Sequence, residues 1–310
     1  MREFIISDSE NGLTLEKYVF KVLKTAPMSF VYKLFRKKDV KVNGHHQDKK
    51  YRLMSDDVVA IYITDQQFQE FQKDKELVPN LKIKDLIIYE DQNVLFVNKP
   101  RGLLVQKSNP NDESLDQLVV EYLMATNQYD PNIEKGFVPG PAHRLDRNTS
   151  GLVVFGKNHA SLTLLFELFK NHDLINKHYL ALVVGNVEKD KDTIDAPLLK
   201  DEEKNTVRVS KNGKTAKTVY KVIKRYKVYS LLDVTLLTGR THQIRVHMAS
   251  IGHPLYGDTV YGGEKNGHLL QGQTLHAMTI GFIHPRTKEY MEVEAPLPAY
   301  FQTLLDGFCE

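Results

Sequence analysis

The stretch PAHRLDRNTSGLVVF, residues 141–155, places one aspartate between two arginines, immediately before a short apolar run. The run Leu152 to Phe155 predicts a buried strand. Asn148 and Gly151 are residues that turns use for backbone reasons, so Asp146 can be read as part of a solvated turn. It can also be read as a functional carboxylate, because site residues concentrate in loops at strand ends. The stretch alone leaves both interpretations open.

The size and composition indicate an ordinary soluble protein. The 310 residues are enough for a large core and predict two domains, and 41% of them are hydrophobic and 26% charged. No apolar run is long enough to span a bilayer, and the start MREFIISDSE lacks the pattern of a signal peptide, so we expect a cytoplasmic protein. The single cysteine, Cys309, excludes a disulfide framework and a thiolate metal cage.

Positive charge is concentrated in two segments, although the net charge is only +3. Residues 31–52 contain eight Lys or Arg against two Asp, and residues 204–227 contain nine and no acidic residue. One basic run is usually a solvated face. Two runs in separate regions favour a partner with a phosphate backbone.

The first part of the chain, residues 13–63, reads as a compact unit. LEKYVFKVL has the apolar spacing of a helix, and SFVYKLFRKK continues with a second amphipathic helix. DVKVNG then predicts a short strand that ends in an Asn-Gly turn, and DDVVAIYI predicts another strand.

Residues 65–80 are polar and Gln-rich, which suits a linker between domains. From residue 81 to 310, short β-type runs dominate, with helices expected in DESLDQLVVEYLM and LTLLFELF. Strands mixed irregularly with few helices predict an α+β domain around a mostly antiparallel mixed sheet.

The stretch TGRTHQIRVH, residues 238–247, alternates in a way that predicts a strand carrying Arg245 as a fixed positive charge. The histidines at 242, 247 and 253 raise the question of a metal. On a strand, His242 and His247 would point to opposite faces, so we expect no metal site.

Other catalytic motifs fit poorly. HRLD resembles the kinase catalytic loop with one residue inserted, but no Gly-rich loop before a strand lysine and no DFG accompany it. The sequence has neither a P-loop nor GxGxxG followed by a ribose-binding acid. Ser150 lacks the GxSxG context of a nucleophile.

Several motifs together carry a family resemblance. HRLDRNTSG, KHYLALVVG, TGRTHQIRVHMASIGHPLYGD, LHA and FIHP occur in the order and spacing of RluA-type pseudouridine synthases. The likeness runs from about residue 86 to 297, and IIYEDQNVLFVNKPRGLLVQ looks like the family's opening strand, turn and strand. The amino-terminal unit matches the RluC/RluD branch, and APMSFVYKLFRKKDVKVNG looks closest to the RluC group.

This resemblance implies an RNA isomerase that needs no cofactor. The bond between C1′ and N1 of a uridine is cut, the uracil turns, and C5 is joined to C1′. The family's catalytic aspartate corresponds to Asp146, which attacks the base, attacks the sugar or removes a ribose proton. Its buried arginine corresponds to Arg245, which would keep Asp146 ionised. Its active-site tyrosine corresponds to Tyr179, which can stack on the uracil.

The target uridine must leave its stack to react, and Arg144 is expected to fill the vacated space. His143 is expected to brace the loop. Residues 13–63 resemble the alpha-L RNA-binding module of a small-subunit ribosomal protein. That likeness implies RNA contacts from five basic residues: Lys33, Arg36, Lys37, Lys38 and Lys41. Ser55-Asp56-Asp57 departs from the module's usual Gly-Asp and puts its final turn in doubt.

The expectation is therefore a monomeric pseudouridine synthase whose partner is large-subunit ribosomal RNA. Two other hypotheses remain: a catalytically idle RNA-binding protein on the same scaffold, and a metal-dependent RNA hydrolase. The presence of Asp146, Tyr179 and Arg245 together favours the isomerase, since a pure binder needs none of them.

Overall fold

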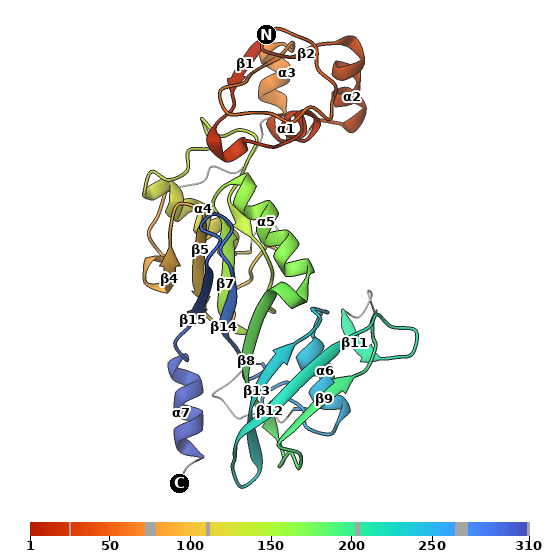
Figure 1. Ribbon diagram of the computed structural model, residues 1–310, viewed down its shortest axis with the longest axis vertical. Helices are drawn as coiled ribbons and strands as arrows, with labels where there is room; N and C mark the ends of the chain where they lie inside the picture. The colour runs from red at the N-terminus through yellow and green to blue at the C-terminus, as the bar shows by residue number, and fades with distance from the viewer. Residues whose placement is uncertain (25, 72–78, 110–111, 202–204, 264–271, 309–310) are drawn as a thin grey trace.

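The computed structural model of the protein describes residues 1–24, 26–71, 79–109, 112–201, 205–263 and 272–308. Part of the expected linker, 72–78, lies outside them, as do Lys204 and Cys309. The molecule is elongated, with the N-terminal elements at one end and the C-terminal helix at the other (Figure 1). None of the helices in these ranges is long and apolar enough to cross a membrane.

The N-terminal elements form a small sheet with two helices packed on it. In chain order they are β1 (Arg2–Ile5), a 3-10 helix η1 (Asp8–Glu10), α1 (Leu15–Val22), α2 (Met28–Lys37), β2 (Val40–Val42) and β3 (Val58–Ile61). The sheet order is β1-β3-β2, and both pairs are antiparallel. Both expected helices and both expected strands are confirmed, but β1 lies before the expected start at residue 13.

Two turns fix this small sheet. Asn43 and Gly44 both have positive φ, as a tight two-residue hairpin turn requires, and Val42 pairs with His45 across it. The turn that the sequence left in doubt is closed by Asp57, whose carboxylate accepts from Asn43 Nδ2 at 2.8 Å and from Met54 N at 2.9 Å. Asp56 takes the left-handed conformation there, with φ 69°.

The expected linker begins with a short helix, α3 (Asp65–Glu70). Thr64 caps it, accepting from Gln67 N, while the Gln67 side chain accepts from Thr64 N at 3.1 Å. Phe71, directly after α3, packs into the core of the N-terminal elements. The polar composition of residues 65–70 therefore reflects the exposed face of a helix.

The rest of the chain forms one ten-stranded sheet with helices on both faces. Its strands follow the order β4-β5-β7-β14-β8-β13-β12-β9, with β15 beside β14 and β6 beside β7. Their bounds are β4 (Ile87–Glu90), β5 (Val94–Lys99), β6 (Gly140–Pro141), β7 (Ser150–Gly156), β8 (Ile175–Val184), β9 (Lys191–Asp195), β12 (Lys217–Arg225), β13 (Tyr229–Leu236), β14 (Leu275–Ile283) and β15 (Tyr290–Glu294). Among the strands named in the described chain, only β7 and β14 pair in parallel, so the prediction of a mostly antiparallel α+β fold is confirmed.

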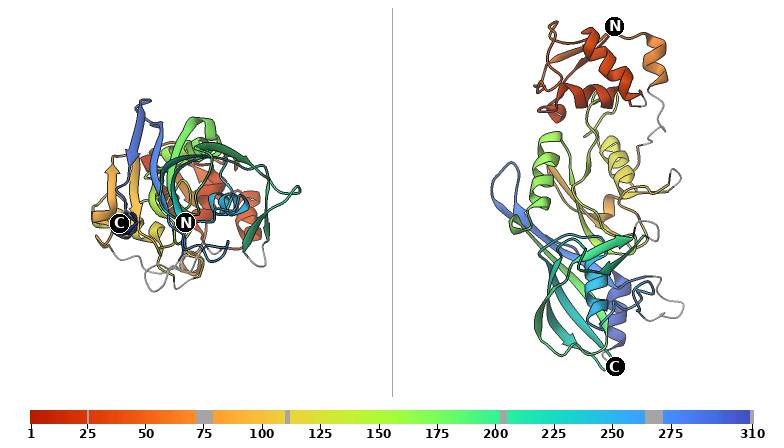
Figure 2. Two further views of the ribbon diagram at one scale, coloured as in Figure 1. Left: turned by 90° about the horizontal axis from the view of Figure 1, so that it is seen from below. Right: turned by 90° about the vertical axis from the view of Figure 1, so that its right-hand side faces the viewer.

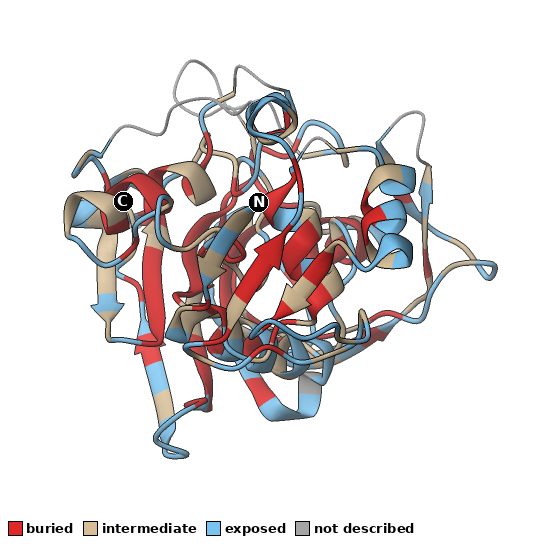
Figure 3. Cartoon of the chain, turned by 90° about the horizontal axis from the view of Figure 1, so that it is seen from above, coloured by how far each residue is buried: buried red, intermediate tan, exposed pale blue. Residues whose placement is uncertain are grey.

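The helices divide between the two faces of this sheet (Figures 1 and 2). One face carries α4 (Leu115–Ala125) and α6 (Gln243–Ser250), and the other carries α5 (His159–Lys170) and α7 (Ala299–Gly307). Two 3-10 helices, η2 (Lys84–Leu86) and η3 (His172–Leu174), and a separate hairpin of β10 (Leu198–Asp201) and β11 (Thr206–Val209) complete the fold. Buried residues follow the central strands, and exposed residues gather at the hairpin tips (Figure 3).

The parallel contact between β7 and β14 depends on Gly151. Its φ is +110°, and a Cβ added there would lie 2.2 Å from the Ala277 carbonyl oxygen, so the site requires glycine. Gly151 pairs with Lys99 on one side and Ala277 on the other, and Ala277 pairs with Tyr179. Lys99, Gly151, Ala277 and Tyr179 therefore form one row across β5, β7, β14 and β8, and this row lies at the start of β7.

The N-terminal elements dock on the large sheet through η1. Glu10 is fully buried, and its carboxylate accepts from the backbone of Gly136 and from Ser7 N at 3.0 Å. Gly136 packs directly against the ring of Tyr18, where a Cβ would clash. His159 Nδ1, at the start of α5, lies 3.2 Å from Asn11 O.

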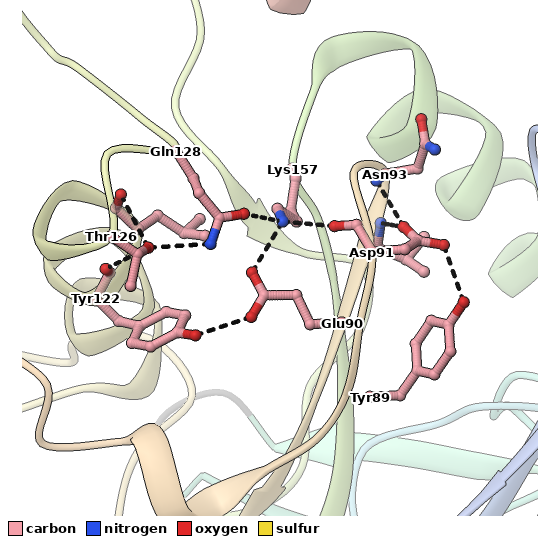
Figure 4. Close-up of polar contacts among 10 residues, drawn as sticks. Tyr89, Glu90, Asp91, Asn93, Tyr122, Thr126, Gln128 and Lys157 are labelled. Atoms are coloured by element: carbon pink, nitrogen blue, oxygen red, sulfur yellow. Dashed lines mark hydrogen bonds and ion pairs between the residues drawn. The ribbon is translucent and has the colours of Figure 1, made fainter.

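A buried lysine ties three elements together at the end of the sheet nearest these contacts (Figure 4). Lys157 Nζ donates to Glu90 at 2.8 Å, to the backbone oxygen of Asp91 and to Gln128 Oε1. Tyr122 donates to the other Glu90 oxygen at 2.8 Å. Burial and Glu90 raise the pKa of Tyr122 to about 12, so the phenol keeps its proton. The network fixes β4, β7 and α4 relative to one another.

Candidate active site

Asp146 lies in the loop between β6 and β7, on the face that carries α4 and α6. Its neighbour Leu145 packs against the hydrophobic clusters under both of these helices. The loop closes with a hydrogen bond from Thr149 N to Asp146 O at 3.0 Å. The Asp146 side chain remains 29% exposed, so it can be reached from solvent.

Asp146 and Arg245 are in contact, as the sequence predicted. Arg245 Nη1 donates to Asp146 Oδ2 at 3.0 Å, although the two residues are 99 positions apart. The same guanidinium forms a fork with Asp258, through Nε at 2.6 Å and Nη2 at 2.9 Å. Burial opposes the charge on Arg245, but Asp258 and then Asp146 raise its pKa above the ordinary value. A permanent cation therefore stands beside Asp146.

The prediction of a strand at residues 238–247 was wrong. Gln243–Ser250 is the helix α6, and Arg245 projects from it. Six consecutive residues of this helix, Gln243 to Met248, are buried. A helix that is buried on every side shows no 3.6-residue apolar period, because its polar side chains are also inside and hydrogen-bonded. That is why the alternation resembled a strand.

Sequence reasoning missed the acidic partner of Arg245. Asp258 is 1% exposed and sits in a tight turn, where its carbonyl accepts from Tyr261 N at 3.2 Å and Gly263 N at 2.7 Å. Gly257, just before it, has φ +79°. The one signal available was the Tyr-Gly-Asp at the end of the motif TGRTHQIRVHMASIGHPLYGD.

Tyr179 comes from β8 and lies on the same face as Asp146. It is 8% exposed and belongs to the cluster under α6. Burial, and then the negative charge of Asp146, raise the pKa of its phenol, so the hydroxyl stays protonated. The structure therefore brings together all three residues expected to be catalytic: Asp146, Tyr179 and Arg245.

Lys99, at the end of β5, is a second residue that sequence reasoning missed. It is fully buried, and its ammonium donates to the carbonyls of Pro100, Leu103 and Arg147 at 2.9–3.0 Å. Burial lowers its pKa to about 7, and Asp146 opposes the shift. Because Arg147 directly follows Asp146, Lys99 holds the Asp146 loop in place.

The three histidines considered as metal ligands do not converge. His247 is bound between Thr218 Oγ1 at 2.8 Å and Ala196 O at 2.9 Å, while His253 Nδ1 contacts Val184 O at 3.0 Å. Among the residues that the structure describes, no group of three or more His, Cys, Asp or Glu could hold a metal ion.

His143 braces the Asp146 loop, as expected. Its Nε2 accepts from Val154 N at 3.2 Å, and its ring stacks on Phe169 at 4.3 Å between centroids. Ser150, considered as a nucleophile, is 1% exposed and bound to His276 Nδ1 at 2.9 Å and Tyr300 at 3.1 Å. Ser150 therefore has a structural role.

The basic residues expected to contact RNA lie on the N-terminal elements, at one end of the molecule (Figure 1). Helix α2 buries Val31 and Leu34 and turns its cations outward. Lys33, Arg36, Lys37 and Lys38 are exposed, and Lys41 is half-buried with its Nζ 5.1 Å from the Tyr62 ring. Arg144, two residues before Asp146, is exposed.

Comparison with known proteins defines the class. The family model for RNA pseudouridylate synthase matches residues 93–250, which contain Asp146, Tyr179 and Arg245. Among solved structures, human RNA pseudouridylate synthase domain containing 4 has a TM-score of 0.61 at 21% identity, covering 74% of this chain and 94% of that one, which supports the fold.

Curated relatives extend the match to nearly the whole chain. Ribosomal large subunit pseudouridine synthase C of Vibrio vulnificus is 35% identical and covers 94% of this chain and 91% of its own. An uncharacterized RNA pseudouridine synthase of Bacillus subtilis, YlyB, is also 35% identical, covering 97% and 96%. The chain belongs to the RNA pseudouridylate synthase family. The sequence-based prediction of an RNA pseudouridine synthase is thereby confirmed.

Proposed function

We propose that this enzyme isomerises specific uridines of large-subunit ribosomal RNA, with Asp146 as its essential carboxylate. The observation that carries the proposal is the contact between Asp146 Oδ2 and Arg245 Nη1 at 3.0 Å. The choice of RNA is supported by the relatives that are named ribosomal large subunit pseudouridine synthase C.

The reaction exchanges bonds without redox change. The N1–C1′ bond breaks, C5 bonds to C1′, C5 loses its proton and N1 gains one. Within the described chain, Asp146 Oδ2 is held by Arg245 while no hydrogen bond engages Oδ1. Oδ1 is thus free to attack the base, attack the sugar or remove a ribose proton. All three roles need an ionised carboxylate, which the guanidinium favours.

Tyr179 has the burial and protonation for a stacking role. A neutral phenol on the floor of the site can cover one face of the uracil without adding charge beside Asp146. Arg144 is exposed next to the loop, and its planar guanidinium can occupy the space that a flipped uridine vacates. Both assignments belong to the same proposal.

The chain divides, in this proposal, into an RNA-binding module at residues 13–63, a linker at 65–80 and a catalytic domain at 81–310. Lys33, Arg36, Lys37, Lys38 and Lys41 bind the phosphate backbone away from the target uridine. The exposure of Lys33, Arg36, Lys37 and Lys38, on α2 and directly after it, supports this. The enzyme acts as a monomer in the cytoplasm and without a cofactor.

Tritium release from [5-³H]uridine-labelled large-subunit ribosomal RNA tests the proposal, because the C5 hydrogen leaves only when C5 forms a new bond. We expect release by the wild type, none by Asp146→Asn, and full release by Asp306→Asn, an exposed control in α7. EDTA should have no effect. Release by Asp146→Asn, or its loss on chelation, would refute the assignment. Binding without release would identify an idle binder.

Mapping pseudouridines in ribosomal RNA from a deletion strain tests the substrate class. We expect specific large-subunit positions to lose the modification and to regain it on complementation with the wild type but not with Asp146→Asn. Unchanged large-subunit RNA in the deletion strain would contradict the proposed substrate.

A further inference from the structure

His242 lies beside Asp146, in a backbone conformation that non-glycine residues rarely adopt. It precedes α6 with φ 53° and ψ 19°, in the left-handed region. Its side chain is 14% exposed, and its Nε2 faces Asp146 Oδ2 at 3.7 Å. A residue held in this region of backbone conformation at a site is a candidate for function, because the fold must hold it there.

The side-chain amide of Gln243 fixes the turn before His242, because all of its hydrogen-bond donors and acceptors are engaged. Gln243 Oε1 accepts from Thr238 Oγ1 at 2.8 Å and Arg240 N at 3.0 Å. Its Nε2 donates to Lys217 O and Thr218 Oγ1, both at 2.9 Å. Because every donor and acceptor is used, the backbone of His242 cannot relax to an ordinary conformation without breaking these bonds.

The tautomer of His242 follows from its other nitrogen. Nδ1 lies 2.7 Å from the Tyr261 hydroxyl, and that oxygen already accepts from Val207 N at 2.9 Å. Burial raises the pKa of Tyr261, so it keeps its proton and has one hydrogen to donate. Donation to Nδ1 satisfies both groups, which leaves the hydrogen of the neutral imidazole on Nε2, facing Asp146.

The charges around His242 agree with a neutral ring. Burial lowers the pKa of His242; Asp146 and Asp258 oppose the shift, while Arg245 and Lys200 add to it. Tyr261 also lies under the guanidinium, with Arg245 Cζ 4.9 Å from its ring. The turn from Asp258 to Tyr261 therefore orients both groups that face Asp146: Asp258 holds Arg245, and Tyr261 holds His242.

We propose that His242 is a second positioning residue for Asp146, which donates Nε2–H to Oδ2 when RNA binds and leaves Oδ1 to the substrate. This rests on the proposed role of Asp146. The separation of 3.7 Å is longer than a hydrogen bond, and such contacts are often long before substrate binds and shorten in the complex. His242 and Arg245, which both lie at the start of α6, then donate two hydrogen bonds to Asp146 Oδ2.

Paired substitutions isolate the donated hydrogen. His242→Gln keeps an N–H at the Nε2 position, whereas His242→Phe keeps a planar ring without a donor. Both residues tolerate the left-handed backbone less well than histidine, so the cost to folding is common to the pair. We expect kcat for tritium release from labelled ribosomal RNA to fall about 30-fold in His242→Phe and less than about fivefold in His242→Gln, with KM unchanged.

Equal kcat for the Phe variant and the wild type would overturn the proposal. So would equal losses in the Phe and Gln variants, since these would show a merely steric role.

A measurement without RNA separates this proposal from the proposed activity. The ¹⁵N imidazole shifts of His242 in the free enzyme should show a protonated Nε2 and an unprotonated Nδ1, and Tyr261→Phe should abolish this preference. The opposite tautomer in the wild type would overturn the proposal even if tritium release were normal. Absence of release by the wild type would instead refute the proposed function.

Discussion

Arg245 is expected to be needed for its planar fork as well as for its charge. Arg245→Lys keeps one positive charge, but a single ammonium cannot reproduce the bonds at 2.6 and 2.9 Å to Asp258 together with the bond at 3.0 Å to Asp146. Two unit charges about 4 Å apart at an effective dielectric near 20 attract by about 4 kcal/mol.

Solvent reduces this attraction at the Asp146 carboxylate. Asp146 is 29% exposed, so about half of the attraction, on the order of 2 kcal/mol, is expected to bear on the reaction. Loss of this attraction between Arg245 and Asp146 corresponds to about a 30-fold fall in kcat. KM should change little, because Arg245 is 7% exposed and lies beneath the carboxylate.

Removing the charge altogether needs a second change. Arg245→Met would leave Asp258, which is 1% exposed, as an unpaired buried charge, and breaking such a pair costs about 3–5 kcal/mol of unfolding free energy. Arg245→Met with Asp258→Asn removes both charges and should recover most of that stability without recovering activity.

Single-turnover tritium release with saturating enzyme measures the chemical step, and urea unfolding followed by circular dichroism measures stability. We expect Arg245→Met with Asp258→Asn to fold and to release tritium at less than about one thirtieth of the wild-type rate. A folded double variant that retained more than about a tenth of the wild-type rate would refute the electrostatic reasoning.

Three further predictions follow from the fold and the site. Gly151→Ala should lower the free energy of unfolding by about 3 kcal/mol or prevent folding, because its Cβ would lie 2.2 Å from Ala277 O. In the same urea-unfolding measurement Gly307→Ala, whose Cβ meets open space, should be neutral or slightly stabilising. Equal effects of the two substitutions would contradict this. The buried His276 has its pKa lowered by burial to about 4. The unfolded chain therefore binds more protons below about pH 6.5, so stability falls as the pH drops towards 4, by about 2 kcal/mol at pH 5. His276→Gln should show a correspondingly smaller loss between pH 7.5 and 5, and an unchanged loss would argue against a buried neutral ring. Lys33→Glu with Arg36→Glu should raise KM for RNA about tenfold or more and reduce the salt dependence of KM, while leaving kcat unchanged. Lys170→Glu, at an exposed lysine of α5, should leave KM unchanged. An unchanged KM in the double variant would show that α2 is not part of the RNA-binding surface.

Local patterns predicted the elements whose signals are local. The amphipathic spacing of α1, α2 and α5 identified them, and Asn43-Gly44 identified its hairpin, because side-chain period and turn chemistry depend only on neighbouring residues. Strand β1 was missed because its four residues carry only a weak alternation and are stabilised by pairing with β3.

The site was predictable only in part. The family resemblance supplied Asp146, Tyr179 and Arg245, but no spacing in the sequence revealed that Asp258 holds Arg245 or that Lys99 binds three carbonyls under the loop. Asp258 lies in an irregular turn 13 residues after Arg245, and Lys99 reaches Arg147 48 residues further along the chain. Neither side chain belongs to a periodic pattern. The strand expected at Arg245 failed because α6 is buried all round, so burial and not amphipathicity determines its composition.

The position of β14 has a consequence for synthesis. β7 and β8 follow each other closely in the chain, yet they are joined in the sheet only through β14, which begins at Leu275. A chain that lacks this strand has the aspartate, the tyrosine and the arginine but not the element that joins β7 to β8. The placement of Asp146, which precedes β7, relative to Tyr179 on β8 therefore depends on a strand that is synthesised after both of them.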